Sequence, residues 1–259
     1  MQILVIRSFL SRSLLKQKST LLFIIISLAL LVTTYLISDV NIAARYKLFE
    51  DVLLSSQMFI LHMAAFFYAF DYLQKERIGG IFILPFSTGI SRLTYYMGVW
   101  LALVSVVALL TLIFIGIDIG FLFLVEGAFV GEILWQIVLY FISSVILLSL
   151  VLMFSQYVSI MNAMVYSSIF FMVGNALDEI YYYAYVIKED ATLEKMASVM
   201  YYFLPNFSYF DFQTRVVSRI DLCVSVFYLQ PLIYGSLIVA IILGIGYFKF
   251  SKRVLKVGE

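Results

Sequence analysis

Residues 133–177 read ILWQIVLYFISSVILLSLVLMFSQYVSIMNAMVYSSIFFMVGNAL and contain no charged side chain. Ser155 and Gln156 lie near the middle and separate two apolar runs, 133–154 and 157–177. Because a membrane-spanning helix needs about 20 mainly apolar residues, each run is long enough to cross a bilayer. Two residues leave room only for a tight turn, so the stretch predicts two neighbouring antiparallel spans.

The whole chain has the composition of an integral membrane protein. Of its 259 residues, 64% are hydrophobic and 13% are charged, and its mean hydropathy is +1.04. A soluble domain has about 45–50% apolar and about 25% charged residues. Further uncharged runs of span length lie at 20–38, 52–70, 95–117 and 226–248. We therefore expect an all-α integral membrane protein with six transmembrane helices, formed by residues 1–259 as a single transmembrane domain.

Basic residues precede the first run, which raises a secretory signal peptide as an alternative. The apolar part of this run, 21–37, is longer than the about 7–15 residues of a signal core, and no A-x-A cleavage site follows, so we expect a retained span. With the N-terminus in the cytoplasm, the segments on that side hold 11 of the 17 Lys and Arg and three of the 16 acids. The net charge is then +8 inside and −7 outside. This bias predicts that the N- and C-termini are both cytoplasmic.

Two segments outside the spans have amphipathic patterns. Residues 2–18 carry apolar side chains at helical spacing with basic ones between them, which predicts an N-terminal amphipathic surface helix; a disordered basic tail is the alternative. The long outer segment 178–225 holds eleven aromatic residues within 181–212, a composition typical of the membrane interface. Apolar residues recur at helical spacing over 193–204, so we expect an amphipathic helix there that ends at Pro205.

Side chains that catalysis needs are scarce. His62 is the only histidine and Cys223 the only cysteine, which excludes a pair of histidines on zinc and a cysteine-based metal cluster. The chain has no G-x-S-x-G nucleophile elbow, and none of its glycines is followed by lysine, so the phosphate-binding loop of ATPases is missing. We expect a protein that is not an enzyme by itself, with no metal site and no cofactor in this chain.

Polar side chains inside the expected spans are costly in lipid and face the bundle interior or a cavity. Gln57, His62, Asn162 and Tyr166 are side chains of this kind. For His62 two interpretations stay open: a titrating group that faces a lumen, and a neutral imidazole in an interhelical hydrogen bond. No charged residue lies in the middle of a run, and 118–132 predicts an interfacial dip on the outer side.

Another short apolar run follows the second span, in KERIGGIFILPFSTGISRLTYYMG, residues 75–98. Its core, Ile78–Phe86, is too short to span a bilayer and too apolar to stay in water. Pro85 ends a helix or begins a new one there. The run therefore lies at the membrane interface or is buried against a partner, and both interpretations stay open.

The order of residues in 76–98 resembles the signature of type-2 ABC transporter permeases. The residues that carry the resemblance are Glu76, Arg77, Gly79, Gly80, Leu84, Pro85, Ser87, Arg92 and Gly98. The six runs, the basic N-terminal helix and the long outer segment with Pro205-Asn206 agree with that family. Val99 departs from its pattern, because the family often has lysine at this position.

The resemblance implies the membrane-spanning permease subunit of an ATP-driven exporter in a bacterial inner membrane. In that family the segment 76–92 is a cytoplasmic coupling helix that docks on a separate cytosolic ABC ATPase, which binds ATP and Mg²⁺. A second permease copy or a paralogue completes the substrate path, for which Gln57, His62, Asn162 and Tyr166 are the candidate residues. The apolar spans favour a hydrophobic cargo. We expect membrane lipid as a further partner and no nucleic acid. A non-transporting scaffold or sensor that binds a cytosolic partner is the alternative function.

Overall fold

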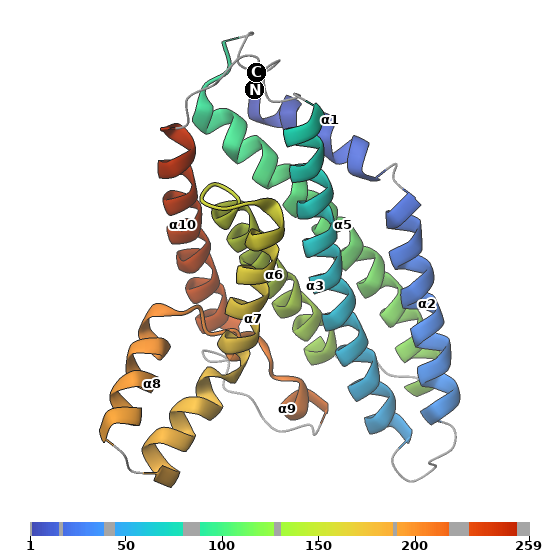
Figure 1. The fold of residues 1–259 in the computed structure, drawn as a ribbon. Helices are drawn as coiled ribbons and strands as arrows, with labels where there is room; N and C mark the ends of the chain where they lie inside the picture. Colours follow the sequence, from blue (N-terminus) through green and yellow to red (C-terminus); the bar gives the residue numbers. More distant parts are fainter. Residues whose placement is uncertain are drawn as a thin grey trace.

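The computed structural model describes residues 2–15, 18–38, 45–79, 89–126, 131–188, 191–217 and 228–252, and the part it describes contains helices and connections without a strand (Figure 1). The elements are α1 (Gln2–Leu15), α2 (Lys18–Ser38), α3 (Arg45–Gly79), α5 (Arg92–Glu126), α6 (Gly131–Phe154), α7 (Ile160–Tyr182), a π-helical continuation η1 (Tyr183–Lys188), α8 (Ala191–Phe203), the 3₁₀ turn η2 (Ser208–Phe210), α9 (Gln213–Val217) and α10 (Gln230–Ser251). The predicted all-α class is confirmed for these residues.

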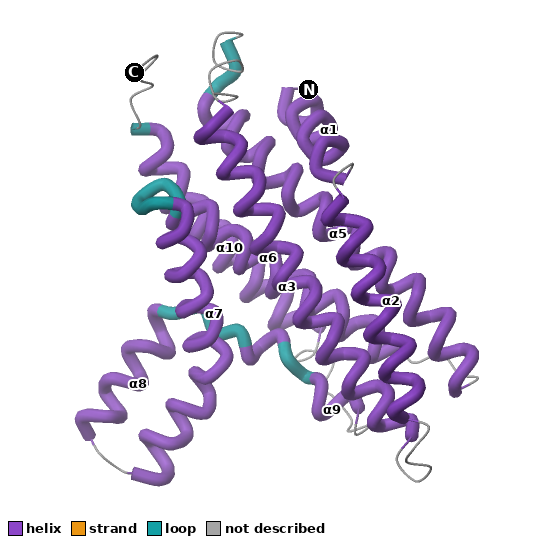
Figure 2. Tube along the Cα trace, turned by 45° about the vertical axis from the view of Figure 1, so that its right-hand side comes forward, coloured by secondary structure: helices purple, strands orange, loops and turns teal. Residues whose placement is uncertain are grey.

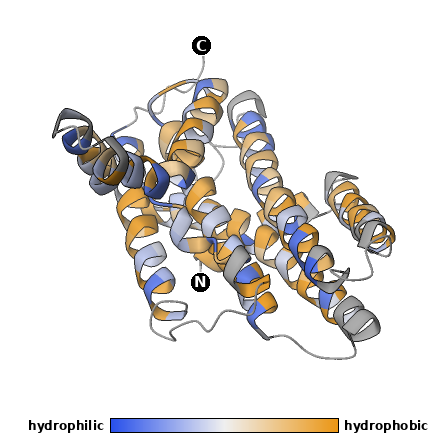
Figure 3. Ribbon diagram, turned by 90° about the horizontal axis from the view of Figure 1, so that it is seen from below, coloured by the Kyte–Doolittle hydropathy of each residue, from blue (hydrophilic) through white to orange (hydrophobic). Residues whose placement is uncertain are grey.

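Five helices are long and apolar enough to cross a membrane. They run over Phe49–Glu76, Arg92–Gly120, Gly131–Phe154, Ile160–Val186 and Gln230–Ser251. Each contains or closely overlaps one of the expected spans after the first. The expected first span, 20–38, lies within helix α2, where the apolar stretch Thr20–Leu30 is shorter than a span. In Figure 3 the hydrophobic colour dominates the bundle, with hydrophilic residues dispersed along it.

Helix α6 lies at the centre of the bundle and packs against α3, α5, α7 and α10. It is apolar on all sides, which suits a helix surrounded by others. Two of its buried hydroxyls bond within the helix: Ser144 Oγ donates to the Tyr140 carbonyl at 2.8 Å, and Ser149 Oγ to the Val145 carbonyl at 2.7 Å. Both hydroxyls therefore satisfy their donors within α6, and Ser149 Oγ also accepts a hydrogen bond from Trp100 Nε1 of α5 at 3.0 Å.

The turn between α6 and α7 is longer than the two residues predicted. It covers residues 155–159, because Ser159 has extended backbone and its side chain accepts a hydrogen bond from the Asn162 amide as the N-cap of α7. A capping serine satisfies a backbone N–H that has no partner within the helix and so sets where the helix begins. The antiparallel order of the two helices is as predicted.

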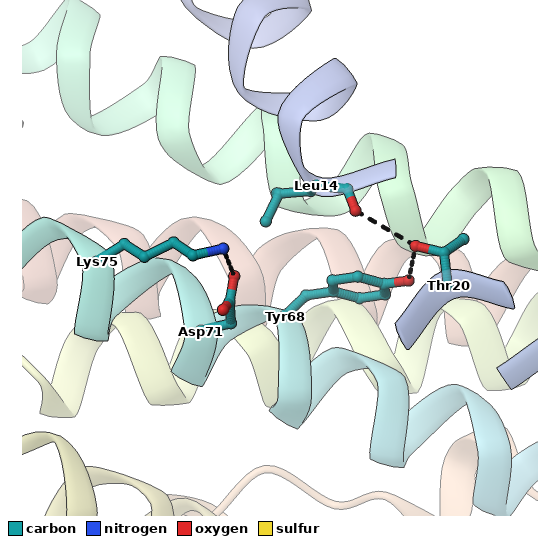
Figure 4. A network of polar contacts seen from close by, with 5 residues as sticks. All are labelled: Leu14, Thr20, Tyr68, Asp71 and Lys75. Carbon is teal, nitrogen blue, oxygen red and sulfur yellow. Dashed lines mark hydrogen bonds and ion pairs between the residues drawn. The ribbon is translucent and has the colours of Figure 1, made fainter. Parts of the chain in front are cut away.

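Helix α1 packs along α5, with Ile6 against Gly98 and Arg7 Nε donating to Ser105 Oγ at 2.7 Å. Figure 4 shows how α1, α2 and α3 meet. Thr20 Oγ1 donates a hydrogen bond to the Leu14 carbonyl at 3.3 Å. The Tyr68 hydroxyl lies 2.7 Å from the same oxygen. Because the Thr20 proton is used for Leu14, Tyr68 is the donor in this second bond. We call this end of the bundle, with α1 and the start of α5, the α1 end.

The opposite end carries a helical hairpin made by the end of α7, η1 and α8 (Figure 2). Helix α8 ends before Pro205, as predicted, and its 13 residues are too few to span a bilayer. After it, residues 204–217 pass alongside α7, α6 and α3 and include η2 and α9. We call this end the α8 end and residues 204–217 the crossing segment.

Helix α5 corrects one prediction for the α8 end. It continues without a break through Glu126, so residues 118–126 form no interfacial dip. Asp118 is fully buried against the rest of the bundle instead of lying at the outer surface. An apolar sequence, Ile119–Val125, follows Asp118, and it extends the helix rather than turning it back.

Candidate functional site

Three helix ends meet at one corner of the α1 end: the end of α3, the start of α5 and the end of α10. The hydroxyls of Tyr72 and Tyr95 lie 2.8 Å apart, and the Tyr95 hydroxyl lies 3.4 Å from Glu76 Oε1. Both tyrosines are buried. This chain of polar contacts joins the last turns of α3 to the first turn of α5.

The end of α10 joins the same corner. Arg92, the first residue of α5, donates from its guanidinium to the Ser251 carbonyl in the last turn of α10. Carbonyls of the last turn have no partner within a helix, and a cation there also favours the helix dipole. The ring of Phe250 stacks on Tyr95 with centroids 6.2 Å apart and lies 5.4 Å from the ring of Tyr96.

The corner is closely packed. The cavity between these side chains measures about 10 Å³, which barely admits one water. A side chain added at Gly246 would meet the Tyr96 hydroxyl and the Met153 backbone, so glycine lets α10 approach α5 and α6 closely. We call Tyr72, Glu76, Arg92, Tyr95 and Phe250 the corner cluster. A displacement of one helix end is transmitted to the others, because close packing leaves no space to absorb it.

Four of the eight residues proposed for coupling belong to the helices that meet at this corner. Glu76, Arg77 and Gly79 belong to the last turns of α3, which continues through Gly79, so they do not begin a separate short helix. Arg92 begins α5. The other four, Gly80, Leu84, Pro85 and Ser87, lie outside the described residues.

Gln57, a predicted path residue, is buried between α3 and α5. Its side chain is 1% exposed, and its Nε2 donates to Asp118 Oδ1 at 3.1 Å. Gln57 Oε1 and Asp118 Oδ2 are also buried, and no residue in the described part of the chain donates a hydrogen bond to either. A proton on Asp118 Oδ2 would supply a donor where two oxygens otherwise lack one. The pair therefore joins two helices.

His62 is also buried, where α3, α6 and α7 meet. Its Nε2 lies 2.9 Å from Ser143 Oγ on α6, its Nδ1 lies 2.6 Å from the Met58 carbonyl, and its ring is 4.6 Å from that of Phe171 on α7. An Nδ1–H donated to Met58 leaves Nε2 to accept from Ser143, which is a neutral imidazole. Of the two interpretations, the interhelical hydrogen bond matches this geometry.

Asn162 and Tyr166 lie on an exposed face of α7. The Tyr166 ring packs edge-on against Phe154, with centroids 5.9 Å apart. The four predicted path residues therefore divide into two buried ones that join helices and two that face away from the bundle.

Sequence reasoning missed a polar network that holds the crossing segment. Gln136 Nε2, on α6, donates to the Phe210 carbonyl at 2.8 Å, and Gln136 Oε1 accepts from the Phe212 amide at 3.1 Å. Asn206 Nδ2 donates to Asp178 Oδ1 on α7 at 2.8 Å, and Ser208 Oγ donates to Asp178 Oδ2. The sequence does show Gln136 as a polar residue in an apolar run. Its partners could not be predicted, because they belong to a segment with no periodic pattern.

Two further features concern ligands. An apolar groove of about 680 Å³ lies between α5, α6 and α10, lined by residues such as Trp100, Val145 and Leu243. Its size and apolar lining suit a hydrocarbon chain. Among the residues that the structure describes, no group of three or more His, Cys, Asp and Glu is placed to hold a metal ion.

No protein-family model matches the chain, and no curated protein matches it.

Proposed function

We propose that the chain is the permease subunit of an ATP-driven exporter that resembles type-2 ABC permeases, with six spans and both termini in the cytoplasm. The observation that carries the proposal is the corner cluster. The segment between Glu76 and Arg92 leaves α3 and enters α5 at the corner where α10 also ends. A partner that moves this segment therefore moves three spans together.

The α1 end supports the cytoplasmic orientation. It carries the basic residues Arg7 and Arg12 of α1, Lys75 of α3 and Lys249 and Lys252 of α10. Basic residues that flank spans are retained on the cytoplasmic side. A cytosolic ATPase would then approach the corner cluster from the side where 76–92 lies.

The face of α7 supports a second permease copy. Met161, Val165, Ile169 and Met172 form an exposed apolar stripe along the helix. Asn162 and Tyr166 lie on the exposed part of the same helix. If two copies meet along α7, these two residues lie beside the path between the copies, as expected for a dimeric permease.

Copurification tests the ATPase. A tagged chain should bring down an ATPase, and Pro85→Ala should abolish most of the ATP turnover of the complex, while Leu112→Ala, on an exposed part of α5, should leave it unchanged. A complex whose partner copurifies but whose ATP turnover ignores both substitutions would support the scaffold or sensor instead. Isolation of the chain alone from its native membrane would contradict both functions.

Disulfide cross-linking tests the dimer. In a Cys223→Ser background, Met172→Cys should form a disulfide between copies in native membranes, because Met172 belongs to the exposed stripe of α7. Leu112→Cys, equally exposed but on α5, is the matched control and should stay monomeric. Equal cross-linking at both positions would mean random collision and would remove the support for an α7 interface.

A further inference from the structure

A pocket lined by five tyrosines and one acid lies at the α8 end. Tyr181, Tyr182 and Tyr185 come from α7 and η1, Tyr201 and Tyr202 from α8, and Asp178 from α7. The pocket measures about 450 Å³, within the range of small-ligand sites. We call it the tyrosine pocket.

The aromatic rings that line the pocket lie close to one another. Tyr181 and Tyr185 stack with centroids 5.8 Å apart and planes 5° from parallel, and the Tyr201 ring lies 5.3 Å from that of Tyr181. Tyr202 is 84% exposed although its ring costs free energy in water. Rings at these separations can contact one small group together, since a cation is attracted within about 6 Å of a ring centroid.

The charge of the pocket favours a cation. Both oxygens of Asp178 accept hydrogen bonds, but the donors, Asn206 and Ser208, are neutral. In the described part of the chain, no lysine or arginine forms an ion pair with Asp178. The hydrogen bond with Tyr209, together with partial burial, raises the pKa of Tyr201 above its ordinary value, so this ring stays a neutral phenol. The pocket therefore combines one carboxylate with neutral aromatic faces.

We propose that the tyrosine pocket binds a quaternary ammonium group, either free or carried by a lipid headgroup. Aromatic rings attract such a cation through their quadrupoles, and its methyl groups need no hydrogen-bond partner. The carboxylate of Asp178 adds charge attraction at one side. This inference does not depend on the exporter function, because binding is measured on the chain without an ATPase.

Free ligand is tested first, with the full chain in detergent. Tetramethylammonium should bind saturably by calorimetry and by saturation-transfer NMR of its methyl protons. Choline should bind likewise, whereas 3,3-dimethylbutan-1-ol, its uncharged carbon isostere, should bind much more weakly. Equal binding of choline and the isostere would overturn the proposal, because the pocket would then recognise shape without charge.

Substitutions locate the site. Tyr182→Leu and Tyr202→Leu should each weaken tetramethylammonium binding about 3- to 10-fold, while Tyr182→Phe keeps the ring and should bind almost as the native chain does. Tyr183→Leu is the matched control: Tyr183 is exposed on the same hairpin but lines a different cavity, with Met196 and Ala197. An equal loss in Tyr183→Leu, or an equal loss in Tyr182→Phe and Tyr182→Leu, would contradict binding to the ring faces of this pocket.

Lipid nanodiscs distinguish the two sources. If a lipid headgroup fills the pocket, the chain should bind less tetramethylammonium in phosphatidylcholine nanodiscs than in phosphatidylglycerol nanodiscs. In the same case, Tyr202→Leu should reduce the amount of phosphatidylcholine that stays bound in native mass spectrometry. If the ligand is free, the two nanodiscs should bind tetramethylammonium equally. Absence of binding in detergent and in phosphatidylglycerol nanodiscs would overturn the proposal.

Discussion

Helices α6 and α7 are consecutive and membrane-length, but their surroundings differ. In the most apolar window of each helix, 78% of residues are buried in α6 and 22% in α7. α6 has neighbours on all sides, whereas α7 contacts α6, α3 and the α8 end and leaves a stripe uncovered. Apolarity therefore places a helix in the membrane, while its neighbours decide whether a side chain meets protein or lipid, because lipid and protein interiors are about equally apolar.

The largest expected difference between the two helices comes from truncating an apolar side chain. Leu147 is fully buried on α6. Leu147→Ala should lower the free energy of unfolding by about 2–5 kcal/mol, because a cavity remains in the bundle. Ile169→Ala, on the exposed stripe of α7, should lose less than about 1 kcal/mol. Reversible unfolding of the monomer in detergent measures both. Equal losses would mean that α7 is covered as completely as α6.

The next effect concerns the point where α7 meets the crossing segment. A side chain at Gly174 would meet the Pro205 carbonyl and the ring of Phe207, so Gly174→Ala should cost about 1–3 kcal/mol. It should also increase hydrogen exchange at the Phe207 amide, which bonds to the Gly174 carbonyl at 3.1 Å. Gly116→Ala is the control, because open space surrounds Gly116. An unchanged Phe207 amide would show that this contact does not anchor the segment.

A smaller loss should follow from removing the amide of α6 that holds the same segment. Gln136→Leu leaves the Phe210 carbonyl and the Phe212 amide without their partner, and we expect a loss of about 1–2 kcal/mol. The loss should be accompanied by faster hydrogen exchange at Phe212. Gln74→Leu, at an exposed position on α3, should change neither quantity. Protection of Phe212 that survives in Gln136→Leu would assign the anchoring to other contacts.

The smallest effect concerns the hydrogen bond between His62 and Ser143. Ser143→Ala should cost about 0.6 kcal/mol, the usual worth of an interhelical hydrogen bond in a membrane protein. Ser144→Ala is the matched control on α6, because its hydroxyl bonds to the Tyr140 carbonyl of its own helix. Nitrogen chemical shifts of the His62 ring should change in Ser143→Ala alone. Equal shifts in both variants would indicate a general distortion of α6.

The candidate site was predictable in part. The pattern around 76–98 pointed to the ends of α3 and α5, where Glu76 and Arg92 do lie. The contact of Arg92 with the Ser251 carbonyl could not be predicted, since it joins residues 159 positions apart and any helix end offers a similar carbonyl. Gln57 and His62 stand out in the sequence as polar residues in apolar runs, but their partners Asp118 and Ser143 depend on how three helices are rotated.

The sequence by itself determined the helical class, the positions of five apolar helices and the short helix that ends before Pro205. These follow from run length, charge and proline, which act locally along the chain. Only the tertiary structure decided that α6 is enclosed and α7 exposed, that 204–217 crosses the α8 end, and that tyrosines from α7, η1 and α8 line one pocket. The reason is physical: inside a bilayer every apolar face is tolerated, so packing and a few polar contacts, not hydropathy, select the neighbours.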